Sequence, residues 1–334
     1  MSGGSVVSPD VIFDTLFAYQ RTAALKAAID LDLFTAIDNG ANDVPALAAK
    51  TGASERGVRI LSDFLVTLDM LAKQNGRYEL SATAAAFLSK KSRMYMGTMA
   101  QFLTLPEIKR NFDDLTGSVK RGGVQPSGNT VSDENPVWVE FARAMVPMAM
   151  ANAHAMAEVI DVPSNGRVLD IAAGHGMYGI VLAQRHPTAH VTAVDWAPVL
   201  AVAREHATGA GVDSRYETRA GDAFTTPFGD GYDLTLITNF LHHFTVDQNT
   251  AFLRKVAAAL KPSAQVAIVE FVPNPDRVTP PMPARFALTM LAGTPQGDAY
   301  TLAEHTGMLE AAGFGGVKTH SLPTPQTLIL ATRK

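Results

Sequence analysis

Residues 168–179 (VLDIAAGHGMYG) restrict the fold of this chain more than any other segment. An apolar run ends in an acid at Asp170, a loop of small residues follows, and a helical pattern then begins. Gly174 and Gly176 let the backbone approach a ligand at places where a side chain would collide with it. Together with Gly179 they match the GxGxxG pattern of nucleotide-binding loops. The segment therefore predicts a strand, a tight turn beside a ligand, and a helix.

The rest of the chain beyond residue 167 continues this alternation of short strands with helices. The predicted strands cover residues 168–171, 190–195, 216–220, 234–238, 265–271, 316–321 and 327–331, and the predicted helices cover 179–185, 198–208, 247–260 and 302–312. Such alternation predicts a Rossmann-like, doubly wound α/β sheet that binds its ligand at the carboxyl ends of the strands. The last two strands are joined without a helix, so we expect an antiparallel hairpin to close the sheet.

The start of the chain has a different pattern, in which helices precede a hairpin. Residues 11–38 carry apolar side chains at helical spacing and predict one amphipathic helix. Residues 44–50 predict a short helix, and Ser54 is a suitable N-cap for a second helix that runs to about residue 70. Asn75-Gly76 between apolar flanks predicts a tight β-hairpin. This order of elements is typical of a winged helix.

Two further segments connect these halves. Residues 117–136 are rich in Gly, Pro and Ser and predict an irregular connection. Residues 138–160 are helical in pattern, and residues 145–160 predict a buried or cleft-lining helix. We therefore expect an N-terminal winged-helix-like domain over residues 1–105 and a catalytic domain over residues 106–334.

The charge distribution argues against binding to nucleic acid or to a membrane. The net charge is −4, and the second helix of the winged-helix pattern interleaves Arg56 and Arg59 with Glu55 and Asp63, which leaves no basic face for phosphates. We therefore expect the N-terminal domain to serve in packing or dimerisation.

The chain contains no cysteine, which excludes disulfides, thiolate metal sites and cysteine nucleophiles. Its histidines lack the spacing of metal ligands, so no metal is expected. Because no signal peptide or apolar span long enough for a bilayer is recognised, we expect a cytoplasmic protein.

Three acids follow three successive predicted strands, at the same edge of the sheet. Asp170 would repel a pyrophosphate but could pair with a cationic amine. Asp195 suits a ribose diol, and Asp222 could accept a hydrogen bond from an adenine amine while Phe224 stacks on the ring. Three acids beside a glycine loop predict a ligand that contains a nucleoside.

These motifs resemble a known family. Residues 150–334 resemble class I S-adenosylmethionine (SAM) methyltransferases, and the whole chain is similar to the dimeric O-methyltransferases that include the caffeic-acid and acetylserotonin enzymes. The family's glycine loop reads Asp-Val-Gly-Gly-Gly-x-Gly, and Ala172-Ala173 replace its first two glycines here. The resemblance implies SAM as cofactor and a homodimer formed by a winged-helix-like domain.

The resemblance also implies a set of cofactor contacts. The methionine part of the cofactor is expected near Asp170 and the loop that follows it, the ribose near Asp195 and the adenine near Asp222. The expected cofactor-binding residues are Asp170, Ala172, Gly174, Gly176, Asp195, Trp196, Gly221, Asp222, Ala223, Phe224 and Asn239.

Residues 239–244 (NFLHHF) occupy the place where the family carries a Leu-His-Asp-Trp-like segment. By that match His242 is the general base, and Glu270 is the glutamate that orients it. A neutral imidazole, with a pKa of about 6.5, can take the proton of a positioned phenol, whose pKa is about 10. The family's second glutamate is replaced by Ala299, and its lysine four residues before the base is replaced by Thr238.

An apolar acceptor site is expected beside this base. Its candidate residues are Phe141, Met145, Met148, His243, Phe286 and Met290.

The sequence thus predicts methyl transfer from SAM to a small, hydroxylated and aromatic acceptor. Three alternatives stay open: a SAM-binding protein that methylates C or N or catalyses a non-methylating reaction, an NAD-dependent oxidoreductase, and a winged-helix metabolite sensor.

Overall fold

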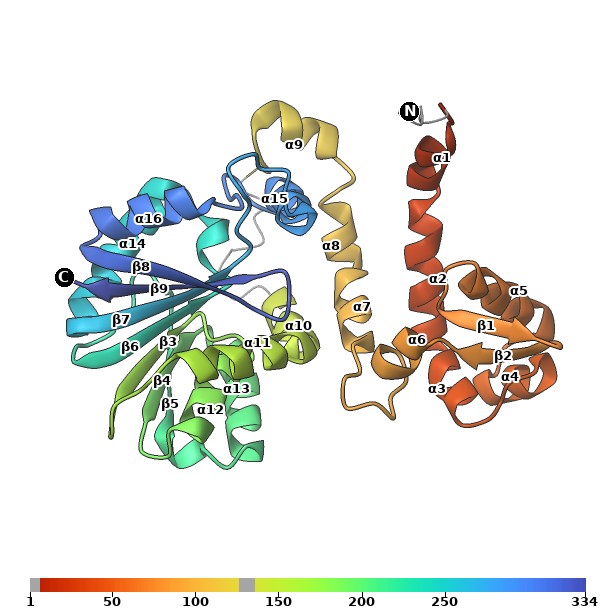
Figure 1. Cartoon of the computed structure of the whole chain (residues 1–334), viewed down its shortest axis with the longest axis horizontal. Helices are drawn as coiled ribbons and strands as arrows, with labels where there is room; N and C mark the ends of the chain where they lie inside the picture. Colours follow the sequence, from red (N-terminus) through yellow and green to blue (C-terminus); the bar gives the residue numbers. More distant parts are fainter. Residues whose placement is uncertain (1–6, 126–135) are drawn as a thin grey trace, which may run out of the picture. The chain divides into compact units, whose positions relative to one another are not determined.

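The computed structural model describes residues 7–125 and 136–334, and the chain divides into two compact units, Met1–Leu105 and Pro106–Lys334 (Figure 1). Within the described residues no helix is long and apolar enough to cross a membrane.

The first unit consists of helices and one hairpin. Its elements are α1 (Asp10–Leu16), α2 (Ala18–Asp30), α3 (Leu33–Asp38), α4 (Val44–Thr51), α5 (Glu55–Val66), β1 (Leu71–Gln74), β2 (Arg77–Leu80), α6 (Ala82–Phe87) and α7 (Gly97–Leu103). The prediction of one helix over residues 11–38 was wrong. The chain turns at Phe17, and Asp32 adopts a left-handed conformation with φ of 54° that no continuous α-helix permits.

The remaining local predictions for this unit hold closely. Ser54 caps α5 by accepting a hydrogen bond from the Gly57 amide at 3.1 Å, but α5 ends at Val66 rather than near residue 70. Asn75 and Gly76 both have positive φ, as a two-residue type I′ hairpin requires. Tyr78 from the hairpin is fully buried with Leu33, Phe34 and Leu47, so the wing completes the core of the helices.

The second unit contains a seven-stranded sheet. Its strands are β3 (Arg167–Ile171), β4 (His190–Asp195), β5 (Tyr216–Ala220), β6 (Tyr232–Thr238), β7 (Leu260–Glu270), β8 (Phe314–Ser321) and β9 (Thr327–Arg333). Its helices are α8 (Pro106–Arg110), α9 (Leu115–Arg121), α10 (Val137–Ala144), α11 (Val146–Val159), α12 (Met177–Arg185), α13 (Ala197–Gly209), α14 (Val246–Ala259), α15 (Pro281–Gly293) and α16 (Leu302–Ala311).

The strand order is β5-β4-β3-β6-β7-β9-β8. The first five strands of this order run parallel, and β9 pairs antiparallel with both β7 and β8. This confirms the predicted doubly wound sheet and its closing antiparallel hairpin. The order reverses between β3 and β6, so a crevice is expected at their carboxyl ends.

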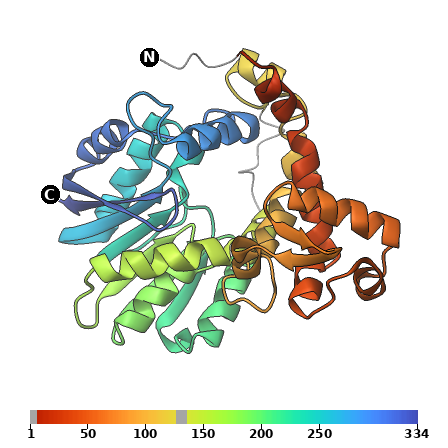
Figure 2. The same ribbon diagram turned by 45° about the vertical axis from the view of Figure 1, so that its right-hand side comes forward.

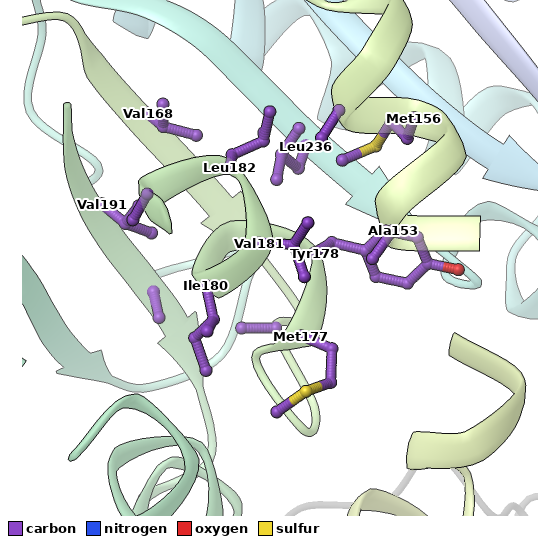
Figure 3. Packing of buried hydrophobic residues seen from close by; sticks show 14 of the residues in the cluster. Ala153, Met156, Val168, Met177, Tyr178, Ile180, Val181, Leu182, Val191 and Leu236 are labelled. Atoms are coloured by element: carbon purple, nitrogen blue, oxygen red, sulfur yellow. The ribbon is translucent and has the colours of Figure 1, made fainter. Parts of the chain in front are cut away.

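Helices cover both faces of the sheet, in keeping with a parallel sheet whose strands are apolar on both sides (Figure 2). One core packs α11, α12 and α13 against the sheet, and Figure 3 shows Val181 and Leu182 of α12 among Val168, Val191 and Met156 of this core. A second core packs α14 and α16 against the opposite face, around Phe252, Val256 and Ile268.

Three predictions for this unit need correction. The irregular connection predicted over residues 117–136 begins inside α9, and its residues 126–135 lie outside the described part of the chain. The helical pattern over residues 138–160 forms two helices divided at Met145, because Pro147 occupies the first turn of a new helix. Helix α15 was not predicted, since its start is rich in proline.

Candidate active site

The loop after β3 brings the backbone to the carboxyl edge of the sheet. Ala172, Gly174 and Gly176 have φ values of 52°, 55° and 75°. A Cβ at Gly176 would lie 2.6 Å from the Tyr216 hydroxyl, and one at Gly179 would lie 2.8 Å from the Asp170 carboxylate. These two glycines therefore permit close packing under the loop, whereas Gly174 lies against open space.

Two adjoining hollows lie at this edge, with volumes of about 530 and 450 Å³. They share the wall formed by Ala172, Asp195, Trp196 and Phe240. The first is completed by Trp138, Phe141, Gly174, Val199, Thr238, Asn239 and His243, and the second by Val194, Gly221, Asp222, Ala223, Phe224 and Phe244. We call the two together the strand-end cleft, and the first alone the histidine hollow.

Asp170 lies beneath the loop without direct access to the cleft. Its side chain is buried, and neither oxygen has a hydrogen-bond partner among the described residues. Burial raises the pKa of Asp170 to about 8, with the nearby Asp195 adding to the rise and the Gly179 amide opposing it. A buried carboxyl in this condition is an electrostatic site for a cation, because a positive group nearby would favour its ionised form.

Asp195 forms the floor between the two hollows. Its Oδ2 accepts a hydrogen bond from the Gly174 amide at 2.8 Å, and its Oδ1 accepts one from the Trp196 amide at 2.7 Å. Burial raises its pKa to about 6, although both amides favour the charged form. One carboxylate thus joins the glycine loop to the start of α13 and exposes the rest of its lone pairs to the cleft.

Asp222 and Phe224 form the far end of the cleft. The Asp222 carboxylate accepts a hydrogen bond from the Phe224 amide, which tightens the turn. The Phe224 ring packs against Phe240 and Phe244 at centroid distances of 6.0 and 4.7 Å. Behind them Lys255 donates to the carbonyl oxygens of Ala223 and Phe224 at 2.8 and 2.9 Å, so α14 anchors this loop.

His242 and Glu270 form a buried pair where β6 and β7 end. His242 Nδ1 lies 2.6 Å from Glu270 Oε2. The other carboxylate oxygen accepts hydrogen bonds from the backbone amides of Phe240 and Leu241 at 3.0 and 2.9 Å. Burial alone would raise the pKa of Glu270, but the contact with His242 and these amides holds it below its usual value. Glu270 therefore shapes the turn that carries the histidine and orients the imidazole.

Aromatic side chains surround this pair. The His242 ring meets the Phe286 ring edge-on at 4.6 Å and lies 4.3 Å from the His243 ring. His243 in turn contacts Trp138 at 5.5 Å, and burial holds the pKa of His243 well below its usual value. A neutral His243 imidazole therefore lines the histidine hollow, and the His242 ring packs against it.

The structure brings most of the predicted site residues together. Those that line the cleft are Phe141, Ala172, Gly174, Asp195, Trp196, Gly221, Asp222, Ala223, Phe224, Asn239 and His243. The described lining does not include Asp170, Gly176, His242, Glu270, Met145, Met148, Phe286 or Met290. Among the described residues no His, Asp and Glu side chains gather as metal ligands.

The predicted site did not include Lys255, which supports the wall through the carbonyl oxygens of Ala223 and Phe224. It also lacked six residues that line the cleft, which are Trp138, Val194, Val199, Thr238, Phe240 and Phe244. Trp138 lies one helical turn before the predicted Phe141, and that spacing was a usable signal. Lys255 lies on α14, far from every motif in the sequence, and no local pattern indicates its contact with the loop.

Two family models match the chain. Residues 13–90 match the O-methyltransferase dimerisation domain. Residues 168–263, which contain the glycine loop, the three acids and the histidine pair, match a methyltransferase domain.

Related proteins match over nearly the whole length. The crystal structure of a protein assigned as an O-methyltransferase from Nostoc punctiforme is 47% identical, with a TM-score of 0.95, over 98% of this chain and 100% of that chain. The 3-hydroxy-5-methyl-1-naphthoate 3-O-methyltransferase of Streptomyces sahachiroi is 29% identical over 95% of this chain and 92% of its own length.

Human N-acetylserotonin methyltransferase, solved in complex with SAM, shares the fold with a TM-score of 0.85 at 21% identity, over 100% of this chain and 99% of that chain. The near-complete match to the Nostoc protein, at 47% identity, establishes the family. The chain is therefore a SAM-dependent methyltransferase and belongs to the O-methyltransferases that carry an N-terminal dimerisation domain.

Proposed function

We propose that this enzyme methylates a hydroxyl oxygen on a small aromatic acceptor, with His242 as the general base. The observation that carries this proposal is the buried pair of His242 and Glu270 beside the strand-end cleft. His242 Nδ1 lies 2.6 Å from Glu270 Oε2. An acid in this position fixes the tautomer of a histidine and stabilises the imidazolium that forms when the histidine takes a proton.

The residues present fit the cofactor. When bound, SAM supplies an electrophilic methyl group on a sulfonium sulfur. Asp170, a buried carboxyl without a partner, provides the negative site that its ammonium group requires. Asp195 would accept hydrogen bonds from the ribose hydroxyls, and Asp222 with Phe224 would hold the adenine. Gly174 leaves room for the methionine part, where a side chain would reduce the histidine hollow.

The arrangement around His242 supports an aromatic acceptor. With Nδ1–H donated to Glu270, the imidazole presents Nε2 as the atom that takes the hydroxyl proton. Phe286 lies against His242, and Phe271 stacks on Phe286 with their centroids 4.3 Å apart. Met290, one helical turn after Phe286 on α15, is buried and adds apolar packing behind this aromatic pair. The Streptomyces relative named for a hydroxynaphthoate is in keeping with such an acceptor.

Turnover of a panel of phenols, followed as release of S-adenosylhomocysteine (SAH) and as mass gain of the acceptor, tests the proposal. His242→Ala should reduce kcat by about 10²–10⁴, as loss of a general base does, with the affinity for SAM retained. His154→Ala on the exposed face of α11 is the matched control and should leave turnover unchanged. A His242→Ala enzyme with normal kcat would exclude His242 as the base, and methylation at carbon or nitrogen would exclude the assigned acceptor atom.

We also propose that the enzyme is a homodimer. Helix α1 exposes a large apolar surface, formed by Val11, Ile12, Phe13, Leu16 and Phe17, all at least half exposed within the described chain. A second copy would bury such a surface.

A further inference from the structure

A chain of three side-chain amides connects the C-terminal hairpin to the histidine hollow. Asn152 of α11 is completely buried, and its Nδ2 donates to Gln326 Oε1 at 2.7 Å. Gln326 is buried just before β9, and its Nε2 donates to Asn239 Oδ1. Asn239 has a left-handed φ of 55° and lines the histidine hollow.

The backbone fixes which end of each side-chain amide donates and which end accepts in this series of hydrogen bonds. The Thr324 amide donates to Asn152 Oδ1 at 3.3 Å. A backbone N–H cannot exchange roles with a carbonyl, so Asn152 must present its oxygen there and its NH₂ to Gln326. The same reasoning makes Gln326 a donor to Asn239. Asn239 therefore turns its oxygen away from the hollow, and its NH₂ group is the end of the chain that a ligand meets.

An amide NH₂ carries two hydrogens, so the Asn239 side chain can donate two hydrogen bonds at this site. The Tyr178 hydroxyl is buried beside Asn152 and Asn239, and both amides oppose the rise that burial causes in the pKa of Tyr178. One Asn239 hydrogen suits that hydroxyl, and the other suits an oxygen in the hollow.

The oxygen that best fits this donor belongs to a carboxylate. No lysine or arginine is found among the described residues that line the histidine hollow. The negative end of the cofactor's methionine part must therefore rely on neutral donors there, while Asp170 attracts its ammonium group from below. We propose that Gln326 and Asn152 are positioning residues that hold Asn239 with its N–H toward the α-carboxylate of the cofactor. This inference rests on the cofactor placement given under the proposed function.

The test compares two ligands that differ by one group, SAH and its decarboxylated analogue. The wild-type chain should bind SAH more tightly by about tenfold or more, as expected for a hydrogen bond to a charged group. Asn239→Ala should bring the ratio of the two Kd values to about one. Gln326→Met, which keeps the side-chain length but removes the donor, should reduce the same ratio. Binding can be followed by calorimetry, with unfolding midpoints recorded for each variant.

Gln184→Met on the exposed surface of α12 is the matched control and should preserve the wild-type ratio. Equal weakening of both ligands by Gln326→Met would indicate a merely structural role and overturn the inference, as would an unchanged ratio in Asn239→Ala. A variant that raises only the KM of the acceptor would overturn it too, since the oxygen would then belong to the acceptor. A wild-type chain that binds neither ligand would contradict the proposed function itself.

Discussion

Asp170→Asn should make the enzyme without cofactor more stable and at the same time abolish tight SAM binding. The substitution keeps the shape of the side chain and removes its titration. In the folded chain the Asp170 carboxyl is buried without a partner, and its pKa is raised to about 8. In the unfolded chain its pKa returns to about 3.9.

The difference between the folded and unfolded pKa values of Asp170 sets the sign and size of the change in unfolding free energy with pH. Between the two pKa values the folded chain holds a proton that the unfolded chain releases, so the wild type loses stability as the pH rises from about 4 to about 8. The loss approaches about 1.4 kcal/mol per pH unit, which gives as much as about 4 kcal/mol at pH 7. The asparagine variant does not titrate, so the gap between the two proteins should widen by nearly 3 kcal/mol (about 1.4 per unit) from pH 5 to pH 7.

Urea unfolding followed by tryptophan fluorescence is the suitable assay. The chain has two tryptophans, Trp138 and Trp196, and both lie in the second unit on the wall of the histidine hollow. Unfolding free energies of both proteins at pH 5, 6 and 7 show directly how the difference between them changes with pH. Constant offsets, such as an unsatisfied amide in the variant, cancel in that change. The reasoning would be refuted if the difference in unfolding free energy did not change with pH, or if the wild type became more stable relative to the variant as the pH rises.

Three further predictions concern other parts of the molecule. Ala172→Gly should raise the unfolding free energy by about 1 kcal/mol, because Ala172 adopts a left-handed φ of 52° that glycine adopts without strain; urea unfolding measures this, and SAH affinity should be preserved. Lys255→Met should raise the Kd for SAH severalfold by releasing the loop at Ala223 and Phe224, and an unchanged Kd in calorimetry would show that the anchor is dispensable. Phe17→Glu should convert dimers to monomers in sedimentation experiments, and a persistent dimer would place the interface elsewhere.

Much of the fold could be predicted because its signals are local. Strands β4 and β5 have the predicted bounds, since each is a short run with residues that favour strands, Val191, Thr192 and Val194 in β4 and Tyr216 and Thr218 in β5. The breaks at Phe17 and Asp32 were not predictable from the helical spacing alone, because a turn at a single residue, left-handed in the case of Asp32, ends a helix without altering the pattern around it. Helix α15 begins with prolines that read as loop, although its packing makes it helical.

The site was predictable to the extent that its residues lie at strand ends. Asp195 and Asp222 reach the cleft because parallel strands end at one edge. Sequence reasoning could not tell that Asp170 lies below the cleft, or that His243 rather than His242 faces the histidine hollow. These outcomes depend on side-chain direction and on packing against α10 and α15, which are remote in sequence.

Glu270 has a further consequence for how this enzyme tolerates change. Its carboxylate serves four neighbouring groups: the imidazole of His242 and the backbone amides of Phe240, Leu241 and His242. A library that scores every replacement for cellular abundance as well as for activity should separate the two members of the pair. Replacements of His242 should yield inactive but abundant protein, whereas replacements of Glu270 should lower the amount of folded protein, so Glu270 is the less replaceable member of the pair.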